Sequence, residues 1–219
     1  MKKIIQLSLV LMLIITGGCG MSKEKENGKI DPSSMPETEA FKDEFTREFM
    51  ASNEEVEEGY YTFKSKTNGY SMKFPDNATL DEMFYEREKD HFETVNFGET
   101  NESSNISYYV IATYEDQPVT KEVEANLSLL SDSVKYEGEY SKEEFEDKTI
   151  YFGKKEYKPE NEDSATHIFF GYIMSKDSDK AVSFIHYVMC SDTKKKCDIN
   201  SVNEEEKTLG FMKSIHFLD

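Results

Sequence analysis

The sequence of 219 residues has little proline and glycine, few basic residues and only three cysteines. Five prolines and 11 glycines exclude a collagen-like or proline-rich chain. The 26 lysines and arginines stand against 44 aspartates and glutamates, which gives a formal net charge of −18. Nucleic-acid binding requires a basic surface, so this charge excludes nucleic acid as a partner.

Long hydrophobic runs are also scarce. The longest run, Ile4 to Ile15, is interrupted by Gln6 and Ser8. It falls short of the roughly 20 residues that a transmembrane helix needs. Thirteen tyrosines and 15 phenylalanines supply enough apolar mass for a core, so we expect a folded chain of one domain or at most two small ones.

The N-terminus has the order of a secretory signal. Two lysines precede the apolar run, and small residues ending in Cys19 follow it. The segment Ile15–Gly20 resembles the lipobox of bacterial lipoproteins, with Thr16 where that family usually has leucine. The resemblance implies that residues 1–18 are a signal peptide and that Cys19 carries lipid, palmitate included, on the extracytoplasmic face of the cell membrane. The alternative is a plain secretory signal with a chance cysteine.

The other two cysteines form an even pair once Cys19 is assigned to lipid. An extracytoplasmic location permits disulfides, and closing the short loop from Cys190 to Cys197 would stabilise the fold by about 2.5 kcal/mol. The sequence therefore predicts a Cys190–Cys197 disulfide, with two free thiols as the alternative.

Removal of residues 1–18 takes away two lysines and no acid, so the net charge falls from −18 to −20. Anionic lipid repels such a chain, and the covalent lipid must therefore do the anchoring. Residues 19–37 are polar without periodicity and are expected to form the lipidated cysteine and a flexible tether. Residues 38–219 are expected to form a single domain.

Phe41, Phe45 and Phe49 recur at intervals of four residues. This spacing predicts a helix over roughly Thr38 to Ala51 with one apolar stripe. The stripe either docks on the core of the domain or faces a partner or a membrane. The acidic residues around it count against the membrane.

Alternating apolar residues predict a hairpin from Tyr61–Ser65 and Tyr70–Phe74, joined by a two-residue turn at Asn68-Gly69. Strands are expected in Leu80–Arg87 and His91–Phe97. The charge-free segment Asn105–Tyr114 is expected to be a central strand with both faces covered.

The second half of the chain is expected to add five further elements. They are, in chain order, a helix opened by Pro118, either a strand at Thr149–Phe152 or a helix capped by Ser141, a hairpin of Ala165–Met174 with Ala181–Met189, a helix with a capping box at Ser201, and a strand at Ser214–Leu218. Hairpins joined by a few helices indicate an α+β fold with a largely antiparallel sheet.

Both ends of this domain resemble PsbP-like domains. Tyr61-Thr62-Phe63 with Gly69–Pro75 resembles their first hairpin, and Gly210–Phe217 resembles their last helix and strand. The resemblance implies a sheet covered by helices and roles in assembly or binding without enzymatic activity. The layout of the whole chain also resembles small lipoproteins of Gram-positive bacteria.

Sequence patterns for catalysis are missing. The chain has no glycine-rich phosphate loop, no G-x-S-x-G, no H-E-x-x-H and no C-x-x-C. We therefore expect no catalytic residues, no cofactor and no metal site. The four histidines are expected to be ordinary residues of strands, and Asp177 and Asp179 solvated residues of a turn rather than calcium ligands.

These observations favour a lipid-anchored module that holds a protein or peptide partner at the cell surface. A ligand- or cation-binding sensor and an unrecognised hydrolase are the alternatives. The excess of acid suggests a cationic protein segment, a cationic peptide or divalent cations as the partner.

Replacing Cys19 by alanine tests the lipid assignment. We expect the Cys19→Ala protein to take up no labelled palmitate and to leave the membrane fraction, because the acyl chains alone hold it there. A variant that still takes up label and still sediments with membranes would contradict the assignment.

Overall fold

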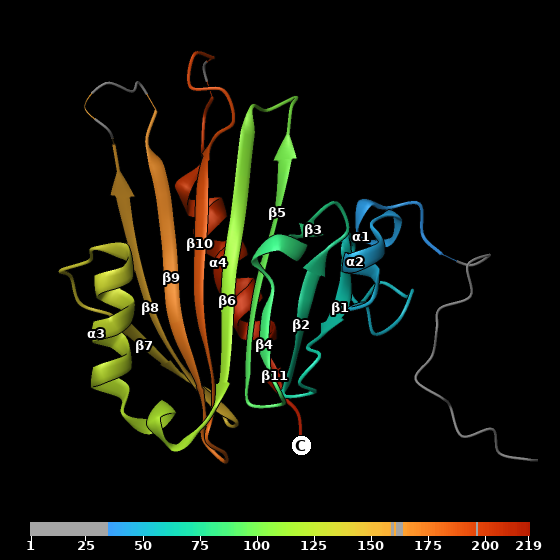
Figure 1. Ribbon diagram of the computed structural model, residues 1–219. Coiled ribbons are helices and arrows are strands. Elements are labelled where there is room, and N and C mark those ends of the chain that lie inside the picture. Colours follow the sequence, from blue (N-terminus) through green and yellow to red (C-terminus); the bar gives the residue numbers. More distant parts are fainter. Residues whose placement is uncertain (1–34, 159, 161–163, 196) are drawn as a thin grey trace, which may run out of the picture.

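A computed structural model describes residues 35–158, 160, 164–195 and 197–219. These residues form two antiparallel sheets (Figure 1): a small one of order β1-β2-β11 and a large one of order β3-β5-β6-β10-β9-β8-β7, in which β4 also pairs with β5. The strands are β1 (Tyr60–Lys64), β2 (Tyr70–Pro75), β3 (Thr79–Leu80), β4 (Glu86–Glu88), β5 (Phe92–Asn101), β6 (Ile106–Asp116), β7 (Ser141–Glu144), β8 (Lys148–Tyr157), β9 (Thr166–Ser175), β10 (Lys180–Cys190) and β11 (His216–Phe217).

Helices cover both faces of the large sheet. They are α1 (Glu39–Lys42), α2 (Glu44–Arg47), the 3-10 helices η2 (Glu82–Phe84) and η3 (Pro118–Lys121), α3 (Val123–Val134) and α4 (Ser201–Ser214). We call the face covered by α4 and the small sheet the inner face, and the face on which α3 lies the outer face (Figure 1). The predicted α+β fold with hairpins is confirmed.

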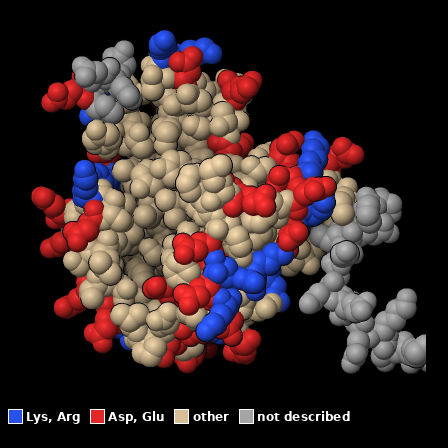
Figure 2. Space-filling model, in the orientation of Figure 1, with Lys and Arg blue, Asp and Glu red and all other residues tan. Residues whose placement is uncertain are grey.

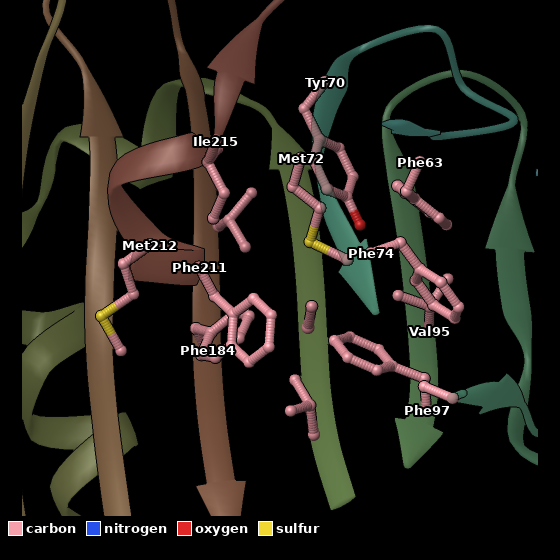
Figure 3. Close-up of a cluster of buried hydrophobic side chains, with 14 of the residues drawn as sticks. Phe63, Tyr70, Met72, Phe74, Val95, Phe97, Phe184, Phe211, Met212 and Ile215 are labelled. Atoms are coloured by element: carbon pink, nitrogen blue, oxygen red, sulfur yellow. The ribbon is translucent and has the colours of Figure 1, made fainter. Parts of the chain in front are cut away.

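The main core lies between the two sheets and α4 (Figure 3). Phe211 of α4 has its ring centroid 6.1 Å from that of Phe97 on β5 and 6.2 Å from that of Phe184 on β10. Phe74 of the small sheet lies 5.0 Å from Phe97. Each such side chain stabilises the fold by roughly 1.5–3 kcal/mol when it leaves water, so the two sheets and the C-terminal helix depend on each other.

Both ends of α4 are fixed by side chains. Asn200 is the N-cap, and its Oδ1 accepts from the N–H groups of Val202 and Asn203, both at 3.2 Å. The predicted capping box at Ser201 is therefore wrong by one residue, because an asparagine precedes it and reaches the same free N–H groups. At the other end, the buried ammonium of Lys148 donates to the carbonyls of Lys213 and Ile215, where the helix dipole is negative.

The first hairpin forms with a longer turn than predicted. Ser65 pairs with Tyr70 through the Ser65 N–H and the Tyr70 carbonyl at 3.0 Å, so four residues lie between them. Asn68 adopts the left-handed conformation at φ 56°, after a turn closed by its N–H and the Ser65 carbonyl. This register differs by two residues from the predicted one. It keeps the same side chains on the buried face, because side chains alternate with a period of two.

The prediction of one helix over Thr38–Ala51 is wrong, because the helix is interrupted at Asp43. The Asp43 carboxylate accepts from the Thr46 N–H at 2.7 Å and starts α2 as a separate turn. Phe41 and Phe49 are each 1% exposed and pack on the small sheet. They dock on the core of the domain and are not partner-facing, while Phe45 is half-buried.

Three other predictions have different outcomes. Leu80–Arg87 is not one strand but comprises the end of β3, η2 and β4, since the adjacent apolar residues Met83 and Phe84 break the alternation. The central strand β6 is confirmed, yet Tyr109 on its outer face is 41% exposed, so that face is only partly covered. Residues 141–144 form strand β7, so the helical alternative there is wrong.

The second hairpin, β9 with β10, is confirmed, and the Cys190–Cys197 disulfide closes a loop directly after it. Asn105 clamps this loop to the β5–β6 turn. Its side chain donates to the carbonyls of Asp192 and Lys195 at 3.0 and 3.2 Å and accepts from the Asp192 N–H at 2.9 Å.

Two glycines give a matched test of this packing. A Cβ on Gly69 would lie 2.1 Å from the ring of the fully buried Tyr114, whereas a Cβ on Gly210 of α4 would meet nothing within 4 Å. We expect Gly69→Ala to lower the free energy of unfolding by about 1–3 kcal/mol and Gly210→Ala to raise it by about 0.5–1 kcal/mol. Urea denaturation measures both, and equal effects of the two substitutions would contradict the packing.

Candidate functional site

An open cleft of about 1380 Å³ lies at the β5 edge of the large sheet. Residues of α1 and α2 line it together with residues of the segment Asp81–Tyr85, which we call the η2 arm. Figure 2 shows the outer face of the molecule, where uncharged side chains fill much of the middle and carboxylates, with some lysine and arginine side chains among them, surround it.

The cleft exists because the outer face is covered unevenly. Helix α3 packs through Leu130 and Val134 on β9 and β10, and no described helix longer than a single turn lies over β5 and β6 (Figure 1). Tyr109 stacks on Tyr187 at 4.5 Å and forms part of this uncovered surface. Gly98 of β5 also lines the cleft and adds no side chain to it.

The η2 arm is held against the sheet by three hydrogen bonds. The Asp81 N–H donates to the Asn96 carbonyl at 2.8 Å, and the Asn96 amide donates to the Phe84 carbonyl at 3.0 Å. At the end of the arm, the Tyr85 hydroxyl donates to the carboxylate of Glu93 at 3.0 Å. These bonds fix the arm on the sheet; residues 81–84 are exposed, while Tyr85 is half-buried.

Two apolar side chains of this arm face solvent. Met83 is 85% exposed and Phe84 is 62% exposed. Phe45 of α2 also lines the cleft, and its ring centroid lies 5.4 Å from that of Tyr85 at the end of the arm. Neighbouring exposed apolar side chains are typical of interaction sites.

The charges around the cleft have one sign. Five carboxylates line it, and no lysine or arginine is among its described lining residues; the five are Glu39, Asp43, Asp81, Glu82 and Glu99. Of these five carboxylates, only that of Glu39 forms an ion pair with a described residue, with Lys42 at 3.0 Å. The carboxylates of Asp43 and Asp81 accept N–H bonds at helix starts. The cleft therefore attracts cations.

The buried Glu93 below the arm has a structural role. One carboxylate oxygen accepts from the Lys66 N–H at 2.9 Å and from Tyr85, and the other has no hydrogen-bond partner among the described residues. Burial raises the pKa of Glu93 above its usual value. This residue joins the first hairpin turn to the η2 arm.

His186 is another buried titratable group. The Thr208 hydroxyl donates to the Glu204 carbonyl at 2.6 Å, so its oxygen accepts from the Nδ1–H of His186, also at 2.6 Å. The Nε2 atom has no partner in the described structure. Burial, followed by the charge of Lys207, lowers the pKa of His186 to about 3. The ring is neutral at pH 7.

The structure brings few of the predicted site residues together. Cys19 lies outside the described residues. The disulfide lies at the end of β10, and only Phe45 of the phenylalanine stripe reaches the cleft. His91 lies in a turn before β5 rather than in a strand. The described residues hold no group of three or more potential metal ligands.

Sequence reasoning missed the η2 arm and the β5 edge. Met83 and Phe84 stand next to each other between acidic residues, a signal that could have marked an exposed apolar pair. Among the helices of the described part, none has both the length and the apolar character needed to cross a membrane.

Two sequence comparisons give consistent results. The sequence model of the protein family described as "Putative lipoprotein YvcA" matches residues 36–216. A protein of Bacillus subtilis (strain 168) named "Putative lipoprotein YvcA" is 28% identical over 235 aligned positions, which cover 100% of this chain and 98% of that protein. Neither match is a PsbP-like domain, so the resemblance of the ends to PsbP-like domains stays a prediction.

Among solved structures, one from Bacteroides thetaiotaomicron VPI-5482 aligns with a TM-score of 0.36 and 11% identity. The alignment covers 72% of this chain and 48% of that one. A similarity of this size carries no functional conclusion.

The buried His186 predicts a component of acid unfolding. Its pKa is near 6.5 in the unfolded chain and about 3 in the folded one. Between these two pH values, His186 binds a proton in the unfolded state but not in the folded state. The free energy of unfolding therefore decreases as the pH falls from about 6.5 toward about 3. At about 1.36 kcal/mol per pKa unit, the loss amounts to a few kcal/mol.

Urea titrations at several pH values between 7 and 4 measure this effect. His186→Phe should flatten the pH dependence, while a substitution of the exposed His216 (His216→Gln) should keep it. If the free energy of unfolding depends on pH in the same way in wild type and in His186→Phe, the pH dependence does not come from His186.

Proposed function

The chain belongs to the lipoprotein family described as "Putative lipoprotein YvcA", and from this membership we propose that it is a lipid-anchored binding module. In this proposal, Cys19 carries the lipid, and the acidic cleft holds a basic segment of a protein or peptide partner on the extracytoplasmic face of the membrane. The proposal includes no enzymatic activity, because charge and apolar contact are sufficient for holding such a segment.

The single observation that carries the proposal is the composition of the cleft. Its carboxylates and its exposed apolar side chains, Met83 and Phe84, lie on the same surface. A segment that combines lysine or arginine with apolar residues matches both. A divalent cation is a weaker candidate, because an ion would use neither the apolar side chains nor a space of about 1380 Å³.

The membrane location agrees with this charge arrangement. Without residues 1–18 the chain carries a net charge of −20 and is repelled by anionic lipid. This repulsion keeps anionic lipid headgroups away from the cleft, so the acidic surface remains available for a basic partner.

A photo-crosslinking amino acid at position 83 tests the proposal in intact cells. We expect position 83 to capture a protein or peptide with a basic segment. The matched control is position 202, since Val202 is also exposed, at 61%, but lies on α4 away from the cleft. Equal capture at both positions, or a captured segment without basic residues, would contradict the proposal.

Salt provides a second measurement on the captured partner. Its association rate should fall severalfold between 50 mM and 500 mM salt, because screening shortens the reach of the carboxylates from about 14 Å to about 4 Å. Glu82→Lys should slow association at low salt. A rate that is flat across this range would show that the acidic cleft is not the recognition surface.

A further inference from the structure

We infer that the basic segment binds as an added β-strand along the free edge of β5, at Glu99–Asn101. This inference rests on the proposed function and specifies how the partner is held. Main-chain hydrogen bonds would supply affinity, and the side chains of the cleft would select a basic, partly apolar sequence.

The pairing of β5 shows where its edge is free. One side of β5 pairs with β6 along its whole length. On the other side β4 pairs with Phe92–Thr94 and β3 pairs with Phe97 and Gly98. Within the described residues, no strand pairs with this side beyond Gly98, although β5 continues to Asn101 and lines the cleft there.

The backbone groups at this edge point outward. The Asn96 carbonyl accepts from the Asp81 N–H, so Asn96 directs its backbone groups toward the β3 side. In an antiparallel strand both backbone groups of a residue point the same way, and the direction repeats every second residue. The register with β6 runs without a bulge. The N–H and C=O of Thr100 therefore point away from β6, into the cleft.

The chain before β3 turns away and leaves this position open. Thr79 pairs with Gly98, so Asn77 would be next in line to pair with Thr100. Instead, the N–H of Ala78 bonds the Pro75 carbonyl at 3.3 Å in a turn that leads back to β2. An added strand would lie in line with β3 and occupy the place that Asn77 leaves.

The charges favour a basic strand over a second copy of this chain. Two copies would each bring a net charge of −18 or lower to the contact and repel each other. A strand alternates its side chains between two faces, and each face of this edge has a carboxylate: Glu82 on the η2 arm and Glu99 on the inner side of β5. Met83 and Phe84 would contact the apolar residues of the strand.

Substitution of Thr100 gives a direct test. Thr100→Pro removes an N–H that no described residue uses, and proline is tolerated at the open edge of a strand. Thr100→Ala is the matched control, because it removes the side chain and keeps the N–H. Thermal unfolding of both variants checks that the fold is intact.

The binding probe is a fluorescein-labelled peptide, acetyl-Lys-Val-Lys-Val-Lys-Val-amide, measured by anisotropy on the full-length protein in a nonionic detergent. We expect Thr100→Pro to weaken binding at least tenfold and Thr100→Ala to leave it unchanged. A peptide N-methylated at alternate residues should lose binding to the same extent, since it cannot form the ladder of hydrogen bonds on that edge.

Equal binding by wild type and folded Thr100→Pro, or no binding of the peptide to wild type, would overturn strand addition. The proposed function would then still stand on capture at position 83 and would fail separately if that capture failed. Self-association that Thr100→Pro abolishes would identify a second copy as the occupant, and the inference of a basic partner would be wrong.

Discussion

The rest of the structure depends on covering the inner face of the large sheet. That face presents aromatic side chains from β5, β6 and β10, and the small sheet alone does not cover them. Helix α4 completes the cover with Phe211 and Met212, and Ile215 follows it into the same core. Because Lys148 bonds the carbonyls at the end of α4, the helix is also tied to β8. The first and last segments of the domain thus meet in one core.

The acidic cleft follows from the same arrangement. With α4 and the small sheet on the inner face, α3 is the longest described helix on the outer face, and it packs on β9 and β10. The β5 side has only the single-turn η2 arm, which binds the sheet through its backbone and through Tyr85. The apolar side chains of the arm, Met83 and Phe84, are therefore exposed to solvent. They lie beside the unpaired edge of β5 and beside the carboxylates of the cleft.

The sequence located the strands better than it located helix caps, turns and the free edge of the sheet. Alternation located both long hairpins, since one buried face imposes a period of two on any register. It did not reveal the longer turn at Asn68 or the break at Asp43, because a cap or turn depends on hydrogen bonds that several short sequences satisfy equally. The prediction from the phenylalanine stripe failed for a related reason: Phe41 reaches the core from α1, and Phe49 reaches it from the turn that follows α2. The cleft could not be predicted, as it arises where strands of different length end side by side.

The C-terminal position of α4 and β11 has a consequence for biogenesis. Strand β11 pairs with β2, and α4 fills a core to which residues before position 100 contribute about half, so distant parts of the chain must meet before the fold is complete. Contacts of such long sequence separation form late. If the chain is threaded through a translocation pore from its N-terminus, its core cannot close until residues 201–217 have emerged. The chain would thus cross as an unfolded polymer, and its core would form only once α4 and β11 had also reached the far side.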